Sequence, residues 1–166
     1  MGAMTDTSDR LVNMAQIMNT SSPQAVALGL RTLEISPGRV VMIAPYREDL
    51  IGNPSTGVIA GGVVTTMLDH ASGQAVYAAL DLPDAVATLD LRIDYMRRAE
   101  PRRALFVEAH CYRVTHAIAF VRAVAYDADK ADPVATAQSA FMLNSSAGRP
   151  AGANLKPPAA KAKGAR

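Results

Sequence analysis

The chain has 166 residues, of which 49% are hydrophobic and only 5% aromatic, with no Trp. This length suits one domain with a substantial core and is short for two, and the composition is globular rather than disordered. The net charge of +2 arises beyond residue 143, because five basic residues and no acid lie there: Arg149, Lys156, Lys161, Lys163 and Arg166. Residues 1–143 carry 12 basic against 15 acidic side chains, so no nucleic-acid partner is predicted, and residues 144–166 are expected to form a disordered basic tail.

The cysteine content and the hydropathy of the sequence indicate the cellular compartment in which the protein is expected. The single cysteine, Cys111, excludes an internal disulfide, and no apolar leader is visible at the start, so a cytoplasmic protein is expected. No apolar run approaches the ~20 residues that a membrane-spanning helix needs, so no membrane partner is expected. The histidines His70, His110 and His116 lack the spacing of metal ligands, and neither a metal nor a cofactor is predicted.

The first third of the chain predicts short helices and a hairpin. Apolar residues recur at helical spacing over residues 9–18, and the stretch "SSPQAVAL" combines a Ser cap with Pro in the first turn, so residues 1–29 are expected to be helical. Two apolar runs follow, over residues 30–35 and 40–46. They are joined by Pro37 and Gly38, in the order that a type II turn favours, which predicts a β-hairpin.

The rest of the chain predicts one long helix followed by strands. Residues 61–80 form an apolar helical pattern that ends at the breaker "DLPD". Side chains then alternate along residues 87–95, 105–112, 118–126 and 134–143, and three of these strands can form an antiparallel meander. One sheet wrapped around one central helix, an α+β domain over residues 30–143, accounts for this order with the fewest elements.

Two features of the predicted helix invite a chemical interpretation. Gly61 and Gly62 stand at its start, where glycine leaves the free N–H groups uncovered and able to stabilise a developing oxyanion. Asp69 lies off the apolar stripe formed by Val64, Leu68, Ala71, Ala75 and Ala79. A lone acid on a helix is ordinarily a solvated residue, and glycines at a helix start are often turn residues, so the pattern alone leaves both readings open.

The sequence resembles a known family from "NPSTGVIAGGVVTTMLDHASGQAV" through "VATLDLRIDYMRRAEPRRALFVEAHCYRVTHAIAFVRAVAYDADKADPVATAQSAFML". These stretches are similar to the hot-dog fold acyl-CoA thioesterases of the phenylacetyl-CoA and hydroxybenzoyl-CoA thioesterase type, over residues 30–143. In that family a loop Asn, an H-G-G motif, an acid eight residues after the first Gly and a Ser or Thr at the next strand form the site. The matching residues are Asn53, Gly61 and Gly62, Asp69, and Thr88.

The resemblance implies a mechanism and an assembly. The amide of Gly61, with that of Gly62, would polarise the thioester carbonyl, while Asp69 would act either as general base on water or as nucleophile. Asn53 would position the carbonyl or the water, and Thr88 would hold the water from the facing subunit. The strand that begins at Thr88 resembles the family's dimer-forming strand, so a homo-oligomer, a dimer or tetramer with sites between subunits, is expected.

The binding of coenzyme A is less defined by the sequence. Arg97, Arg98, Arg113 and His116 are candidates for its phosphates, with solvated turns as the alternative. The chain departs from the family at two places. Ala60 stands where the family usually has His, and His116 follows Thr115 where relatives more often carry Gly followed by Lys or Arg.

Three functions stay open at this point. The leading one is hydrolysis of an acyl-CoA to the free acid and coenzyme A. A hot-dog hydratase or dehydratase would need an acid working with a nearby His, and His70 points about 100° away from Asp69 around the helix. A non-catalytic acyl-CoA binder would fit the Ala60 change, but a carboxylate beside a thioester is hard to explain by binding alone.

Overall fold

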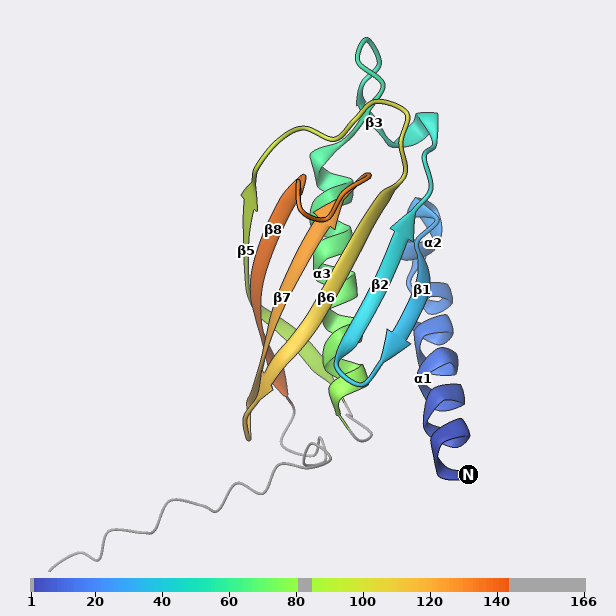
Figure 1. Cartoon of the computed structure of the whole chain (residues 1–166), viewed down its shortest axis with the longest axis vertical. Coiled ribbons are helices and arrows are strands. Elements are labelled where there is room, and N and C mark those ends of the chain that lie inside the picture. Colours follow the sequence, from blue (N-terminus) through green and yellow to red (C-terminus); the bar gives the residue numbers. More distant parts are fainter. Residues whose placement is uncertain (1, 81–84, 144–166) are drawn as a thin grey trace, which may run out of the picture.

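The computed structural model describes residues 2–80 and 85–143. A six-stranded antiparallel sheet curves around one long helix, α3 (Gly61–Ala79), so that the sheet forms one layer and the helix the other (Figure 1). The strands of this sheet are β1 (Arg31–Ser36), β2 (Arg39–Ala44), β5 (Val86–Tyr95), β6 (Leu105–Val114), β7 (Ile118–Tyr126) and β8 (Ala135–Leu143). This is the hot-dog arrangement expected from the sequence, and the predicted meander is present as β6, β7 and β8.

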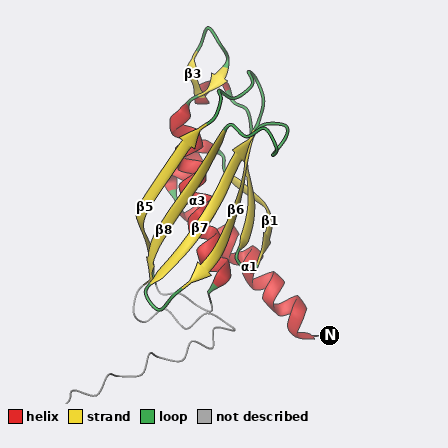
Figure 2. Ribbon diagram, turned by 60° about the vertical axis from the view of Figure 1, so that its left-hand side comes forward, coloured by secondary structure: helices red, strands yellow, loops and turns green. Residues whose placement is uncertain are grey.

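The strand order is β1-β2-β6-β7-β8-β5, with every neighbouring pair antiparallel. β5 follows the helix but pairs with β8, the last strand, so the loop from β5 to β6 passes along the end of the sheet near β3 before the meander begins (Figure 1, Figure 2). The two ends of the sheet are therefore β1 and β5. Their outer sides pair with no strand within residues 2–80 and 85–143.

Helix α3 lies in the concave side of the sheet and forms most of the core. The predicted stripe is confirmed at Val64, Leu68, Ala71 and Ala75, which are at most 2% exposed. Met67 is also fully buried, which places it in the core. The helix contacts β2, β5, β6, β7 and β8. Small residues on this stripe allow the curved sheet to approach the helix closely over its whole length.

The N-terminal helices are α1 (Gly2–Ser21) and α2 (Pro23–Leu28). α1 is longer than the predicted segment and packs against β1 and α3. α2 begins as predicted, because the Ser22 hydroxyl accepts a hydrogen bond from the amide of Ala25 at 3.3 Å and Pro23 occupies the first turn. It ends at Gly29, whose φ of 66° is the left-handed conformation that glycine adopts without strain.

The predicted hairpin is present as β1 and β2, with Gly38 at a φ of 72° in the turn. The sequence did not indicate the 3-10 turn η1 (Glu48–Leu50) or the two-stranded sheet of β3 (Ile51–Asn53) and β4 (Val58–Ile59) that stands at the start of α3 (Figure 1). These strands are too short to show an alternating pattern. The predicted breaker at residues 81–84 and the tail at 144–166 lie outside the described residues.

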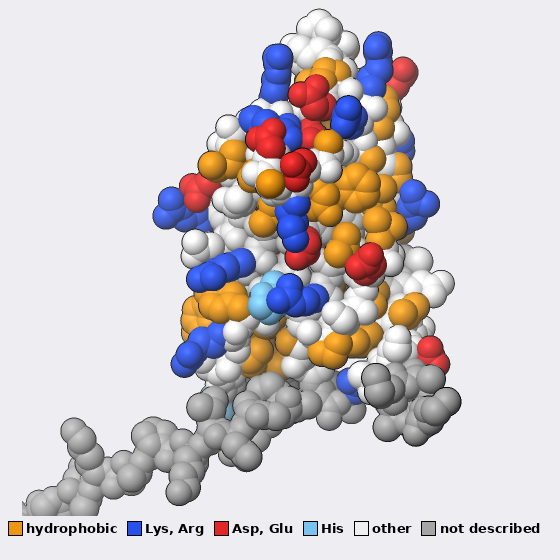
Figure 3. Space-filling model, in the orientation of Figure 1, with side chains coloured by type: hydrophobic (Ala, Val, Ile, Leu, Met, Phe, Trp, Pro, Cys, Tyr) orange, Lys and Arg blue, Asp and Glu red, His pale blue; other side chains and the backbone are white. Residues whose placement is uncertain are grey.

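No described helix covers the outer face of the sheet. Hydrophobic side chains are interspersed there with acidic and basic ones (Figure 3). The rings of Phe106 and Tyr126 stack with centroids 5.5 Å apart, and the guanidinium of Arg122 lies 4.5 Å from the ring centroid of Tyr112. Of the helices in residues 2–80 and 85–143, none is long and apolar enough to cross a membrane.

Candidate active site

The start of α3 is not capped by a side chain. Ala60 occupies the N-cap position, and a methyl group cannot accept a hydrogen bond from the first turn. The amide of Val63 donates to the Ala60 carbonyl at 3.0 Å, whereas those of Gly61 and Gly62 have no acceptor in the described part of the chain. Both glycines are exposed. Two free N–H groups therefore stand at the positive end of the helix dipole, where an oxyanion would be stabilised.

Tyr95, at the end of β5, fixes the first turn of this helix. Its hydroxyl donates to the carbonyl of Gly61 at 2.8 Å and lies 2.9 Å from the Thr65 hydroxyl. Tyr95 is half exposed, so its ring also forms part of the surface next to the free amides. No local signal in the sequence predicts this role, because nothing in the alternation of β5 separates Tyr95 from its neighbours.

Gly62 has no steric reason within the chain to be glycine. A Cβ added there would meet no atom within 4 Å, and the φ of Gly62 is not in the left-handed region. Glycine inside a helix costs about 1 kcal/mol relative to alanine. The open space over Gly62 therefore leaves room for a group from outside the chain to approach the two amides.

Asp69 and Thr88 come together in the structure. The Thr88 hydroxyl donates to Oδ1 of Asp69 at 2.9 Å, across the gap between α3 and the start of β5. Asp69 is partly exposed, and Oδ2 accepts no hydrogen bond from any described residue. The family resemblance implied that Thr88 acts from the facing subunit, whereas here it contacts the Asp69 of its own chain. The carboxylate is thus oriented on one oxygen and open on the other.

The two halves of the site are separated within one chain. Gly61 and Asp69 are eight residues apart on one helix, and at 1.5 Å per residue this separates them by about 12 Å along the axis. A thioester carbonyl cannot contact the Gly61 amide and the Asp69 carboxylate of the same chain. Each chain therefore carries two half-sites at different heights on α3.

Asn53 lies at the end of β3, in the turn that leads to β4 and the start of α3. Its Oδ1 accepts hydrogen bonds from the amide and the hydroxyl of Ser55, at 3.0 and 2.8 Å. These contacts fold the turn, and they leave the side-chain NH₂ group without an acceptor among the described residues. Asn53 therefore belongs to the Gly61 end of the site and not to the Asp69 end.

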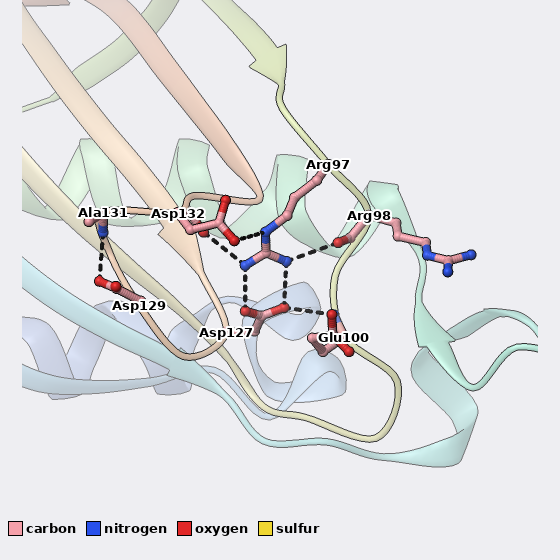
Figure 4. A network of polar contacts seen from close by, with 7 residues as sticks. All are labelled: Arg97, Arg98, Glu100, Asp127, Asp129, Ala131 and Asp132. Carbon is pink, nitrogen blue, oxygen red and sulfur yellow. Dashed lines mark hydrogen bonds and ion pairs between the residues drawn. The ribbon is translucent and has the colours of Figure 1, made fainter.

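Arg97 has a structural role that the sequence analysis did not foresee. All five of its N–H groups donate within the chain: two to the Asp127 carboxylate, one to the Asp132 carboxylate, and two to the carbonyls of Arg98 and Asp132 (Figure 4). The Asp127 carboxylate is fully buried, and hydrogen bonding from Arg97 lowers its pKa to about 2. No donor of Arg97 is left for a coenzyme A phosphate, so its assignment as a binding residue does not fit this structure.

The other candidates for coenzyme A binding lie at two ends of the molecule. The Arg98 side chain points away from the Asp127 network into solvent, near the end of β5 (Figure 4). Arg113 and His116 are exposed near the turn between β6 and β7. The strand register places this turn beside the start of β5, at the opposite end of the sheet from Arg98. A single chain does not bring the two sets together.

His70 belongs to a separate, partly buried network on the other side of α3. Its Nε2 lies 3.1 Å from Oδ1 of Asn19 on α1, and the same oxygen accepts a 2.7 Å hydrogen bond from Gln74. Thr32 on β1 donates to Gln74 Oε1 and accepts from Asn19, at 2.7 and 2.9 Å. Burial lowers the pKa of His70, against the smaller opposing effect of the Asp69 charge. His70 thus joins α3 to α1 and β1 and forms no hydrogen bond with Asp69 in this structure.

Comparison with known proteins identifies the family. The model of the thioesterase superfamily matches residues 56–134, which include the two glycines, Asp69 and Thr88. A candidate esterase of Halobacterium salinarum is 37% identical over 109 residues, covering 63% of this chain and 71% of that protein. The chain belongs to the thioesterase superfamily.

Solved structures agree with this assignment. A protein from Pseudomonas aeruginosa is 36% identical, with a TM-score of 0.74 over 80% of this chain and 98% of the other. The Escherichia coli PaaI protein, from the phenylacetic acid degradation operon, has a TM-score of 0.72 over 83% of this chain and 96% of its own. At 17% identity, the PaaI comparison shows the shared hot-dog fold alone.

Proposed function

We propose that this thioesterase-family chain hydrolyses acyl-CoA thioesters at sites shared between two copies. The observation that carries the proposal is the pair of half-sites on α3: two free amides at Gly61 and Gly62, and a carboxylate at Asp69 oriented by Thr88. A carbonyl-polarising group and a base or nucleophile are the two components that hydrolysis of a thioester requires. Because one thioester cannot contact both half-sites of the same chain, a second chain has to complete each site.

The free edge of β5 offers a way to join the half-sites. Thr88, near the start of β5, holds Asp69, whereas Tyr95, at its end, holds the carbonyl of Gly61. If β5 pairs antiparallel with the same strand of a second copy, the start of one strand lies against the end of the other. Asp69 of one chain then approaches the partner's Gly61. A two-fold axis produces two such sites per dimer.

In this site the thioester oxygen would point at the amides of Gly61 and Gly62 of one chain. Asp69 of the other chain would use its open Oδ2 to activate a water molecule, or would attack the carbonyl directly to form a mixed anhydride. The hydroxyl of Thr88 keeps the carboxylate oriented in either route. Asn53 would contribute its free NH₂ group beside the amides, and Ala60 leaves room there where other family members have an imidazole.

The same pairing gathers the candidate binding residues for coenzyme A. Arg113 and His116 lie at the end of the sheet where β5 begins, and Arg98 lies where β5 ends. In an antiparallel dimer these two ends meet. Arg113 and His116 of one chain with the partner's Arg98 would then form one phosphate-binding region, since guanidinium groups suit phosphate oxygens.

A thiol-release assay with short, medium, long and aryl acyl-CoA substrates tests the activity. We expect hydrolysis of at least one class, and Gly62→Ala provides the sharpest test of the amide half-site. Alanine fits the open space and should raise helix stability by about 0.5–1 kcal/mol, while its methyl group obstructs the approach of the carbonyl. A more stable but slower enzyme supports the proposal. Binding of acyl-CoA without release of thiol from any class would favour the non-catalytic binder instead.

A further inference from the structure

The free side of β5 carries an ordered row of charges. Asp90, Arg92 and Asp94 pair with Ala140, Gln138 and Thr136 of β8, the row that points to the outer face of the sheet. Leu91, Ile93 and Tyr95 point to the face that α3 covers, because their partners on β8 are buried there. Arg92 bonds to Asp94 of its own strand at 3.2 Å, whereas Asp90 has no ionic partner among the described residues.

The backbone of β5 is ready to pair on this side. The amide of Met96 donates to the Val134 carbonyl, toward β8. Because N–H groups alternate in direction along a strand, Leu91, Ile93 and Tyr95 present their amides to the free side. A second β5 can therefore form hydrogen-bonded pairs with these residues.

Symmetry limits the registers that this pairing can take. The shared site, on which this inference rests, needs α3 of both copies on the same side of the joined sheet, so the two-fold axis is perpendicular to the sheet. Directly opposite residues of an antiparallel pair point to the same face. One residue of β5 must then lie on the axis, opposite its own copy, and the central choices are Asp90, Leu91, Arg92 and Ile93.

The charge row separates these four choices. Asp90 on the axis would face another carboxylate, and Arg92 on the axis would face another guanidinium. With Leu91 on the axis, Arg92 faces the partner's Asp90 twice, once on each side of the axis. With Ile93 on the axis, Arg92 also faces an acid, the partner's Asp94, but only residues 91–95 of each strand overlap, against residues 87–95 for Leu91.

We propose that β5 joins a second copy of this chain with Leu91 on the two-fold axis, and that Arg92 and Asp90 select this register. These charges lie in non-hydrogen-bonded pairs, where opposite side chains come closest.

Single cysteines map the axis directly. In the register centred on Leu91, the two copies of Leu91→Cys have Cα atoms about 5.5 Å apart, within the range of a disulfide. The two copies of Arg92→Cys lie about 8 Å apart on the diagonal, and those of Ile93→Cys about 13 Å apart along the strands. The unchanged protein, with its buried Cys111, is the control. After mild oxidation we expect a covalent dimer from Leu91→Cys alone, and preferential cross-linking of either other variant would overturn the register.

A charge exchange tests what selects the register. Arg92→Glu replaces both attractive pairs by repulsive ones and should raise the dimer dissociation constant about tenfold or more at low salt, and less at high salt. Adding Asp90→Lys to Arg92→Glu should restore association. Adding Asp94→Lys instead restores only the ion pair within the strand, so association should stay weak. Sedimentation over a concentration series measures this, and rescue by Asp94→Lys in place of Asp90→Lys would refute the assignment.

These experiments do not depend on catalysis. A dimer cross-linked at Leu91→Cys that hydrolyses no thioester would keep the register and refute the proposed function. A protein that stays monomeric at all concentrations would refute the register and the shared site together. An active enzyme cross-linked through Ile93→Cys would refute the register alone.

Discussion

The two sides of helix α3 carry polar residues of opposite character. Toward α1 and β1, His70 and Gln74 lie in a network in which Asn19 and Thr32 bind each other and the helix. Toward β5, Asp69 has a single hydrogen bond, from Thr88, and a second oxygen that is open. Asp69 and His70 are adjacent in sequence, yet they belong to different sides.

The difference shows that polar groups with a structural role have all their hydrogen-bonding positions used, whereas a group that can act on a ligand keeps one position open. Buried polar atoms that satisfy one another hold elements together, and they have no capacity left for a ligand. An oriented but unsaturated carboxylate can still accept a proton or bind a water molecule. The same distinction removes Arg97 from the binding site, since its donors are all used, and retains Arg98, which points into solvent.

The largest expected effect is on turnover, from a change at Asp69 on the side of α3 that faces β5. Asp69→Asn keeps the size of the side chain and its contact with Thr88 but removes the charge, so turnover should fall about 10²-fold or more, the usual scale for a positioned base. The free energy of unfolding should change by less than about 0.5 kcal/mol. Thiol release and urea unfolding measure the two quantities. Wild-type turnover in a folded, dimeric variant would place Asp69 among ordinary surface residues.

A change on the side of α3 that faces α1 and β1 should have the opposite result, with a loss of stability and little change in turnover. Gln74→Leu removes the acceptor of the Thr32 hydroxyl and one of the two partners of Asn19 Oδ1, next to the fully buried Gln74 position, which should lower the free energy of unfolding by about 2 kcal/mol. Turnover per folded enzyme should stay within about twofold, because the network does not contact the site. The double variant with Asn19→Ala should be less destabilised than the sum of the single changes. Additive losses would show that the residues do not act as one network.

A smaller effect is expected at the contact between β5 and α3. Thr88→Val removes the hydroxyl that orients Asp69 while keeping the shape of the side chain, and should lower turnover about tenfold, the scale of one hydrogen bond to a charged group. Thr88→Ser should restore most of the rate. Equal losses in both variants would indicate that the methyl group, and not the hydroxyl, is needed.

The smallest expected effect is on the pH dependence of stability, through His70 on the side of α3 that faces α1 and β1. Because burial lowers the pKa of His70 in the folded chain, the unfolded chain binds more protons, and stability should fall as the pH drops below about 6.5 toward the folded pKa. His70→Gln should flatten this part of the stability curve. Urea unfolding at a series of pH values from 5 to 8 gives the comparison, and an identical slope in both proteins would contradict the role of His70.

Much of this arrangement could be predicted from local patterns. Alternation predicted β5 to β8 and helical spacing predicted α3, because each has one buried face that its sequence must respect, and two apolar runs around a Pro-Gly turn predicted β1 and β2. The short strands β3 and β4 were not predicted, because two or three residues cannot show an alternation of apolar and polar side chains. Asp69 could be singled out because it lies off the apolar stripe of the helix. Its partner Thr88 was expected from the other subunit, because a sequence does not reveal which strand of which chain a helix faces.

The arginine cluster shows the other limit of sequence reasoning. Arg97 and Arg98 are neighbours with identical chemistry, and only the path of the chain decides which one meets Asp127. An acid in the turn after β7 was visible in the sequence as part of "DADKADP", but its burial was not. Charge partners that lie 30 residues apart depend on the tertiary fold and carry no local signal.

The distance between Gly61 and Asp69 along α3 has a genetic consequence if sites are shared. Chains carrying Asp69→Asn and chains carrying Gly62→Val would each form inactive dimers with themselves. A mixed dimer contains one site with both changes and one site with neither, so two inactive proteins should complement each other. Random mixing of equal amounts makes about half of the dimers mixed, and about a quarter of the wild-type activity should return.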